Sequence, residues 1–308
     1  MRLPLTRTEI AGLTADLSSL SDPRGPDALM ALLRLLYAVG RRDLPLGRLF
    51  EGHVDALQIV TRYSTPAQRA DIESAARAGA VLGVWNADLA GEPLILAKGQ
   101  LWGGKAYASG AGLLSHALVS VDAAGGRQLL LVDLARTPPM VDRSWWRVTG
   151  MQRSETHIVR WEAAAIAPEA LIGGPGDYVR EPFFGGGAIR FAAVQAGGIA
   201  GVVDIVRQHL VAQNRDQDPV QRGRLADLFG AAQAAADAVA RAARGWSTDD
   251  IPSTLAMVAA ARTAVYSAGE TVLTLAQAAV GVQAMFVDHP LAELLTDLTV
   301  YLRQPAPD

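Results

Sequence analysis

Apolar residues recur at helical spacing in the first quarter of the chain. The pattern appears in DALMALLRLLYAVGRR at 27–42, in FEGHVDALQIVTRY at 50–63 and in AQRADIESAARAG at 67–79. Such spacing places apolar side chains on one face of a helix. We therefore predict an N-terminal helical domain over residues 1–78.

The pattern changes between residues 80 and 166. Short segments rich in β-branched and aliphatic residues are separated there by glycine- or proline-containing breaks: AVLGVWNA, EPLILA, HALVSVD, RQLLLVDL and HIVRWEAAAI. Short apolar runs bounded by turn residues are typical of strands. This region predicts a small antiparallel β domain over residues 79–170.

Helical spacing returns in the last part of the chain. Two seams of apolar residues repeat every three or four positions: Leu225, Leu228, Ala232, Ala235 and Val239, then Val265, Ala268, Val272, Leu275, Ala279 and Val282. The small residues along both seams suit a tightly packed helical bundle. Ser247-Thr-Asp-Asp before Ile251-Pro252 has the composition of a helix start. We predict a C-terminal bundle over residues 171–308, so that the fold is mainly α with a central β domain.

One apolar stretch, from Thr263 to Val287, contains a single charged residue, Glu270. It is rich in Ala, Thr, Ser, Gln and Gly rather than in Leu, Ile and Phe. This composition favours a helix buried in a bundle over one that spans a membrane.

Composition excludes several classes of function. The 308 residues carry a net charge of −3, with no run of basic residues, so the chain lacks the basic patch of a nucleic-acid-binding protein. There is no cysteine, and the five histidines include no pair three or four residues apart, so we expect no metal site. The polar first residues, MRLPLTRTEIAGL, do not resemble a signal peptide, and we expect a cytoplasmic protein.

Five segments, in this order from Leu32 to Asp308, resemble the acyl-CoA dehydrogenase family of flavoproteins: YAVGRRDLPLGRLFEGH, GGKAYASGAG, GMQRSET, GGGAIRFAAVQAGGIAG and HPLAELLTDLTVYLRQPAPD. The resemblance implies N-terminal helices, a small antiparallel β-barrel and a C-terminal four-helix bundle. It also implies FAD, an acyl-CoA or related thioester as substrate, an unidentified electron acceptor, and a homodimer or homotetramer. Relative to the usual family chain, about two N-terminal helices are missing.

The resemblance assigns flavin contacts in the β domain. Tyr107 takes the place of an aromatic residue that packs on the flavin ring, and Ser109 that of a hydroxyl near the flavin N5. The backbone of Val84, Trp85 and Asn86 takes the place of the segment that binds the pyrimidine edge. Because side chains alternate along a strand, we expect Tyr107 and Ser109 to share one face.

In the bundle, the resemblance places Arg215 at the flavin pyrophosphate, where a guanidinium donates two parallel hydrogen bonds. Gln221 and Gln277 match glutamines near the adenosine half, which in this family reaches a neighbouring subunit. Arg190 matches the arginine of the first bundle helix, and we expect it to bind substrate.

The family's catalytic glutamate is absent from both of its usual positions, which correspond to Pro305 and Ile189. Two further family residues, an aspartate and an arginine, are replaced by Gly187 and Thr296. Three explanations stay open. Asp177, Glu181 or Asp308 supplies a relocated base; the reaction needs no such base, as in flavin monooxygenases of the same fold; or the chain is a non-catalytic relative that binds flavin or serves as an assembly module.

Trp145 and Trp146, in DRSWWRV, are adjacent aromatic residues in the β domain. If this segment is a strand, one of the two side chains faces inward. We predict that the pair belongs to the core or to an interface.

Overall fold

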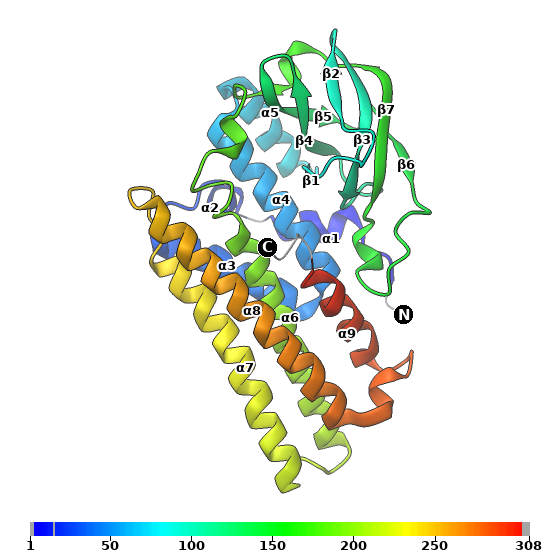
Figure 1. The fold of residues 1–308 in the computed structure, drawn as a ribbon, viewed down its shortest axis with the longest axis vertical. Coiled ribbons are helices and arrows are strands. Elements are labelled where there is room, and N and C mark those ends of the chain that lie inside the picture. Colours follow the sequence, from blue (N-terminus) through cyan, green and yellow to red (C-terminus); the bar gives the residue numbers. More distant parts are fainter. Residues whose placement is uncertain (1–2, 15, 304–308) are drawn as a thin grey trace.

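The computed structural model describes residues 3–14 and 16–303. Within these residues, five α-helices precede the sheet: α1 (Arg7–Ala11), α2 (Leu17–Ser21), α3 (Gly25–Arg42), α4 (Leu44–Tyr63) and α5 (Pro66–Arg77). Four α-helices of the described chain follow it: α6 (Ala188–Ala212), α7 (Pro219–Arg244), α8 (Ile251–Val280) and α9 (Pro290–Tyr301). In Figure 1 the sheet forms one end of the molecule and the long helices form the other.

Helix α4 lies between these two parts and begins six residues earlier than the predicted segment. The Asp43 side chain accepts a hydrogen bond from the Leu46 amide (3.0 Å), and Pro45 occupies the first turn, where its missing N–H costs nothing. The helix ends at Tyr63. Thr65 and Gln68 then form a capping box that starts α5.

The sheet is mixed, with strand order β6-β7-β3-β2-β4-β5-β8 and β1 paired with β4. Its strands are β1 (Leu82–Trp85), β2 (Ile95–Ala97), β3 (Gln100–Ala108), β4 (His116–Ala123), β5 (Gly126–Asp133), β6 (Met140–Asp142), β7 (His157–Ala165) and β8 (Leu171–Ile172). Most pairs are antiparallel, but β4 pairs parallel with both β1 and β2. Hydrophobic patterning does not distinguish the two orientations in short strands, and the parallel pairs were not predicted.

Helix α6 runs through the centre of the bundle and packs against α3, α7, α8 and α9. It crosses α3 closely: a Cβ added at Gly197 would lie 2.1 Å from the Tyr37 carbonyl oxygen. Glycine at this position lets the two backbones approach. Among the described residues, α6 is the one helix long and apolar enough to cross a membrane by length and composition, and 78% of its most apolar window is buried.

The predicted bundle seams are confirmed with one exception. Leu228, Ala232 and Val239 of the first seam are buried, and so are most residues of the second. The predicted start of α8 is also confirmed, because the Asp250 side chain accepts from the Ser253 amide (3.1 Å). Val282 is 73% exposed because α8 ends at Val280 and a short 3-10 helix follows.

Helix α9 connects the bundle to the sheet end of the molecule through side-chain contacts. The buried Asp297 carboxylate accepts a hydrogen bond from the Met151 amide. Arg153, in the same segment as Met151, pairs with Asp43 at the start of α4 and with Glu293 of α9 (3.2 Å). These contacts set the position of α4 relative to the strands that it faces.

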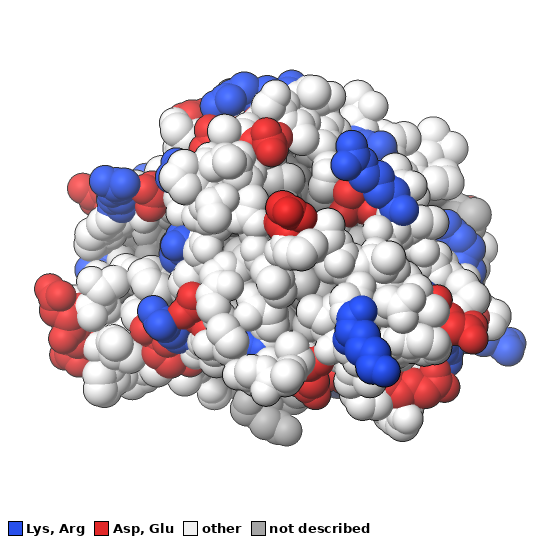
Figure 2. Space-filling model, turned by 90° about the horizontal axis from the view of Figure 1, so that it is seen from above, with Lys and Arg blue, Asp and Glu red and all other residues white. Residues whose placement is uncertain are grey.

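Surface charge gathers into no patch on the face seen in Figure 2, where acidic and basic side chains are scattered among uncharged residues. This view contains no basic surface of the kind that binds nucleic acid.

Candidate functional site

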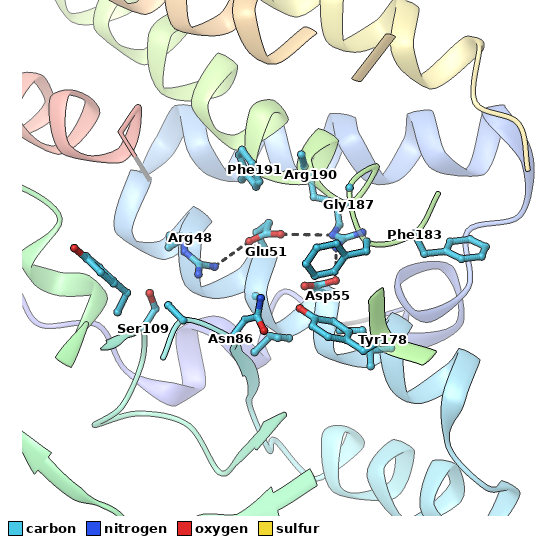
Figure 3. Close-up of a pocket in the computed structure, with 18 of the residues that line it drawn as sticks. Arg48, Glu51, Asp55, Asn86, Ser109, Tyr178, Phe183, Gly187, Arg190 and Phe191 are labelled. Atoms are coloured by element: carbon cyan, nitrogen blue, oxygen red, sulfur yellow. Dashed lines mark hydrogen bonds and ion pairs between the residues drawn. The ribbon is translucent and has the colours of Figure 1, made fainter. Parts of the chain in front are cut away.

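A cavity of about 680 Å³ lies where the sheet meets the helices. Its walls come from α4, from the segment after β1, from the end of β3, and from the loop that leads into α6. This volume lies in the range of roughly 300–1,000 Å³ that is typical of small-molecule sites. Figure 3 shows most of its lining residues, with charged side chains of α4 and of Arg190 in α6 in contact with one another at its wall.

Tyr107 and Ser109 both line this cavity, at the end of β3. They do so through a bulge rather than through regular alternation, because the pairing of β3 with β7 shifts between Lys105 and Ala108. Tyr107 has a φ of +54°, and the Ser109 amide donates to the Tyr107 carbonyl (2.9 Å). A non-glycine residue in this backbone region costs of order 1–3 kcal/mol, and such strain is concentrated at functional sites.

The end of β1 and the residue after it contribute two of the three predicted residues to the cavity. Val84 and Asn86 line it, whereas Trp85 is 1% exposed and donates from Nε1 to the Ser109 carbonyl (2.9 Å). Trp85 therefore holds the turn after β3 against β1, and only its backbone is available to a ligand. The Asn86 Oδ1 accepts from Ser120 Oγ (2.6 Å).

Arg190 of α6 lies buried among polar groups of α4. One of its terminal nitrogens donates to Asp55, the other donates to Gln58 Oε1 (3.1 Å), and its Nε lies 3.5 Å from Glu51 Oε1. Arg48 Nη1 lies 3.0 Å from the second oxygen of Glu51. These four charged residues, Arg48, Glu51, Asp55 and Arg190, form the paired cluster shown by dashed lines in Figure 3.

Glu51 is the carboxylate in this cluster that sequence reasoning missed. It is 5% exposed, and burial raises its pKa although Arg48 and Arg190 act in the opposite direction. A smaller hollow next to the main cavity is lined by Arg48, Gly52, Val84 and Ser109, so the helical turn that carries Glu51 adjoins the Ser109 end. A buried carboxyl with a raised pKa in a cavity is a candidate acid–base group.

A signal for Glu51 was present in FEGHVDALQ. Glu51 and Asp55 are four residues apart, so they lie on one face of a helix. That face also carries Arg48, Gln58 and Arg62, and buried carboxylates are rare unless they are paired. The helical pattern shows the shared face but does not identify the partners.

The two acids predicted as relocated bases do not line the cavity. Glu181 is exposed, and its Oε2 accepts from the Gly185 amide (2.8 Å) in the turn before α6. Asp177 accepts from the Gly174 amide (2.7 Å) and pairs with Arg180 (2.6 Å). Both carboxylates are engaged in holding local loop structure.

The residues that stand at the family's two base positions are Ile189 and Pro305, and those at its replaced aspartate and arginine are Gly187 and Thr296. Ile189 is buried at 1% exposure, and Gly187 lines the cavity. Thr296 Oγ1 donates to backbone carbonyls of its own helix, at Ala292 and Glu293. Pro305 and Asp308 lie outside the described residues.

The three bundle residues predicted for the cofactor do not line the cavity. Gln221, at the start of α7, is 1% exposed. When its side-chain amide is oriented with the oxygen toward Arg215, this oxygen accepts a hydrogen bond from the Arg215 guanidinium (2.6 Å). Gln277 is exposed on α8. The structure thus brings Arg215 and Gln221 together, away from the residues of the β domain.

Trp145 and Trp146 are half-buried rather than fully buried. The Trp145 ring lies edge-on to Tyr107, with centroids 5.0 Å apart, and Trp146 packs against the core. Together the three rings form an aromatic group beside the Ser109 end of the cavity.

One pair of histidines meets in space although the two are far apart in sequence. His289 Nε2 lies 3.2 Å from His209 Nδ1, at the junction of α6 and α9. Within the described part of the chain, no group of three or more possible ligands surrounds a metal position.

Several solved structures have a similar fold. No protein-family model and no curated protein sequence matches the chain. The complex of TdsC from Paenibacillus sp. A11-2, a dibenzothiophene monooxygenase, with FMN and indole has a TM-score of 0.80 at 15% identity, over 95% of this chain and 83% of TdsC. Glutaryl-coenzyme A dehydrogenase has a TM-score of 0.77 at 14% identity, over 95% and 79%. A nitrososynthase from Micromonospora carbonacea var. africana has 0.75 at 20% identity, over 98% and 86%.

Proposed function

We propose that this protein, which has the fold of the acyl-CoA dehydrogenases, is a flavin-dependent oxidoreductase. The flavin ring binds at the Tyr107 and Ser109 end of the cavity, and the substrate lies along α4. The observation that carries this proposal is the buried Glu51 carboxyl, which lines the cavity on the turn next to Ser109.

The residues at this end suit a flavin. Tyr107 is 52% exposed and presents an aromatic surface, and the Ser109 hydroxyl, which accepts from Thr156 Oγ1 (3.1 Å), keeps its own proton to donate. The backbone between Val84 and Asn86 borders the same space. The flavin supplies a hydride acceptor when it is bound.

Glu51 serves as the base in the reaction that we propose first, the α,β-dehydrogenation of an acyl thioester. With flavin bound, the carboxylate would take the proton from the carbon next to the thioester carbonyl, and the hydride of the following carbon would go to the flavin, which leaves a carbon–carbon double bond. Because burial raises the pKa of Glu51, the carboxylate is a stronger base than an exposed glutamate. Arg48 and Arg190 hold it in place.

A second candidate is an oxygen-dependent reaction of the reduced flavin. It is favoured by the buried Ile189, which stands where some members of the family carry the base, and by the monooxygenase fold relative. In this reaction the Arg48, Glu51, Asp55 and Arg190 cluster only orients the substrate.

Three further features belong to this proposal. FAD is the expected flavin, although FMN accompanies TdsC in its solved complex. Arg215, Gln221 and Gln277 would reach the cofactor of a neighbouring subunit in a homodimer or homotetramer. The lack of cysteine fits the expected cytoplasmic location.

Purified protein tests the proposal directly. Flavin that copurifies, or that raises the melting temperature when added, supports it. Anaerobic loss of flavin absorbance with acyl-CoA supports dehydrogenation, whereas substrate oxygenation by chemically reduced flavin and oxygen supports the second candidate. A colourless protein that neither FAD nor FMN stabilises would show the non-catalytic relative instead.

A further inference from the structure

The far end of the cavity, beyond Asp55, is lined by Arg62, Tyr63, Tyr178 and Phe183. Arg62 lies near the end of α4, eleven residues after Glu51. At 1.5 Å per residue this is roughly 16 Å along the helix axis. The far end is therefore separate from the turn that adjoins Ser109.

Within the described chain, the arginine at this end has no ion pair in direct contact, although Asp55 and Asp22 lie near enough to raise its pKa. In the cluster around Glu51, two arginines meet two carboxylates. Arg62, by contrast, has no carboxylate partner among the described residues. Its Nη2 donates to the neutral Gln58 Oε1 (3.3 Å), and its guanidinium lies 4.2 Å from the centre of the Phe183 ring.

Gln58 holds Arg62 close to a second cation. Its oxygen accepts from both Arg62 and Arg190, and its nitrogen donates to the Leu20 carbonyl (3.1 Å). Because Leu20 fixes the amide, the oxygen must face the two guanidiniums. Burial lowers the pKa of Arg62, and repulsion from Arg190 lowers it further, while Asp55 and Asp22 act in the opposite direction. An arginine that contacts a neutral amide and no carboxylate of the described residues can donate charge-assisted hydrogen bonds to an anion.

Tyr63 has an unsatisfied polar group next to this end. Its hydroxyl has almost no accessible surface and no hydrogen-bond partner among the described residues, so in this conformation it does not face the open cavity. Buried hydroxyls without a partner are uncommon unless a ligand or water completes them. Tyr63 follows Arg62 directly and lines the same cavity.

We propose that Arg62 binds an anionic group, a carboxylate or a phosphate, at the end of the substrate that lies farthest from Ser109. The aromatic rings of Tyr178 and Phe183 pack against the apolar body that leads to it. The substrate class is thus an apolar chain or ring with one terminal anion. This inference rests on the proposed function only for the statement that the ligand is the substrate of a redox reaction.

Binding measurements test the subsite without turnover. Octanoate, octyl phosphate and the uncharged octanamide are titrated calorimetrically into the wild type, Arg62→Gln and Arg62→Lys, each as purified and after saturation with flavin. We expect the wild type to bind both anions at least tenfold more tightly than the amide. Arg62→Gln should lose this preference and keep its affinity for the amide, and Arg62→Lys should keep part of the preference. Arg69→Gln on α5, whose partner is Glu73, is the matched surface control.

Several outcomes separate this inference from the proposed function. Equal affinity of the wild type for octanoate and octanamide, or an unchanged preference in Arg62→Gln, overturns the subsite. If Arg62→Gln instead abolishes a preference for FMN over riboflavin, the anion is the flavin phosphate, and the substrate assignment is wrong. If no flavin binds but the anion preference depends on Arg62, the subsite stands and the redox function falls. Melting curves by circular dichroism confirm that each variant is folded.

Discussion

The Oε1 atom of Glu51 lies 3.5 Å from the Nε atom of Arg190, although the two residues are 139 positions apart in the chain. This contact joins α4, which faces the sheet, to α6, the central helix of the bundle. The carboxylate is oriented from two sides, because Arg48 contacts its other oxygen. A group held in this way keeps one geometry toward a ligand in the cavity.

Replacement of Glu51 by glutamine tests its role as the base. The substitution keeps the shape of the side chain but removes its basicity, so we expect the anaerobic rate of flavin reduction by acyl-CoA to fall at least about 100-fold. Flavin content should be unchanged. In the wild type this rate should rise with pH through a value above the ordinary pKa of 4.5, because burial raises the pKa of Glu51.

Glu181→Gln and Asp177→Asn are the matched controls, because both carboxylates bond to loop amides outside the cavity. Their rates should stay within about twofold of the wild type. A large fall in the rate of flavin reduction in either control, together with a normal rate in Glu51→Gln, would show that the base lies in the loop before α6.

Tyr107→Ala should weaken flavin binding. Removal of an aromatic contact costs about 0.5–1.5 kcal/mol, or up to roughly tenfold in the dissociation constant. Quenching of tryptophan fluorescence measures the affinity, since Trp145 lies beside Tyr107. Trp102 is an exposed aromatic residue of the same strand and does not line the cavity. The substitution Trp102→Ala should therefore leave the flavin affinity unchanged. Equal affinity in Tyr107→Ala and the wild type would move the flavin away from this end.

The close crossing of α3 and α6 predicts opposite effects for two glycine substitutions. In Gly197→Ala, the new Cβ would lie 2.1 Å from the Tyr37 carbonyl oxygen, so we expect a loss of about 1–3 kcal/mol in the free energy of unfolding. In Gly230→Ala, nothing lies within 4 Å of the new Cβ, and helix propensity predicts a gain of about 0.5–1 kcal/mol. Urea unfolding measures the free energy of unfolding of both variants. An unchanged free energy of unfolding in Gly197→Ala would show that α3 and α6 can move apart without cost.

His53 makes stability depend on pH. Its Nδ1 accepts from the Leu82 amide (3.0 Å), and burial lowers its pKa from 6.5 to about 4. Below pH 6.5 the unfolded chain binds a proton that the folded protein does not, so this contribution to stability is lost as pH falls. Between pH 7 and 5 the loss is about 2 kcal/mol.

The measurement is the difference in unfolding free energy between the wild type and His53→Asn, whose side-chain oxygen can accept the same bond. This difference should shift by about 2 kcal/mol from pH 7 to 5. The comparison is needed because Asp297, whose pKa burial raises to about 6, acts in the opposite sense: the folded protein holds its proton longer, so acidification stabilises it. A difference that is constant with pH would contradict the assignment to His53.

Part of the candidate site could be predicted from sequence. Tyr107 and Ser109 were named by resemblance to a short motif, and both line the cavity. The motif identifies two residues of the cavity because the β-bulge that orients their side chains toward it lies within a few residues of them. The acids of the loop before α6 were chosen for their position in the chain, and the structure turns them toward loop amides.

The sequence alone determined the order of helices, strands and helices, because spacings of three to four residues and short β-branched runs are local properties. It also determined that Glu51 and Asp55 share one face of α4. Only the tertiary structure decided that this face borders a cavity rather than solid core, and that Arg190 meets it. A helix pattern reports which side is turned from water, whereas the partner on that side comes from a distant part of the chain and depends on how the helices pack.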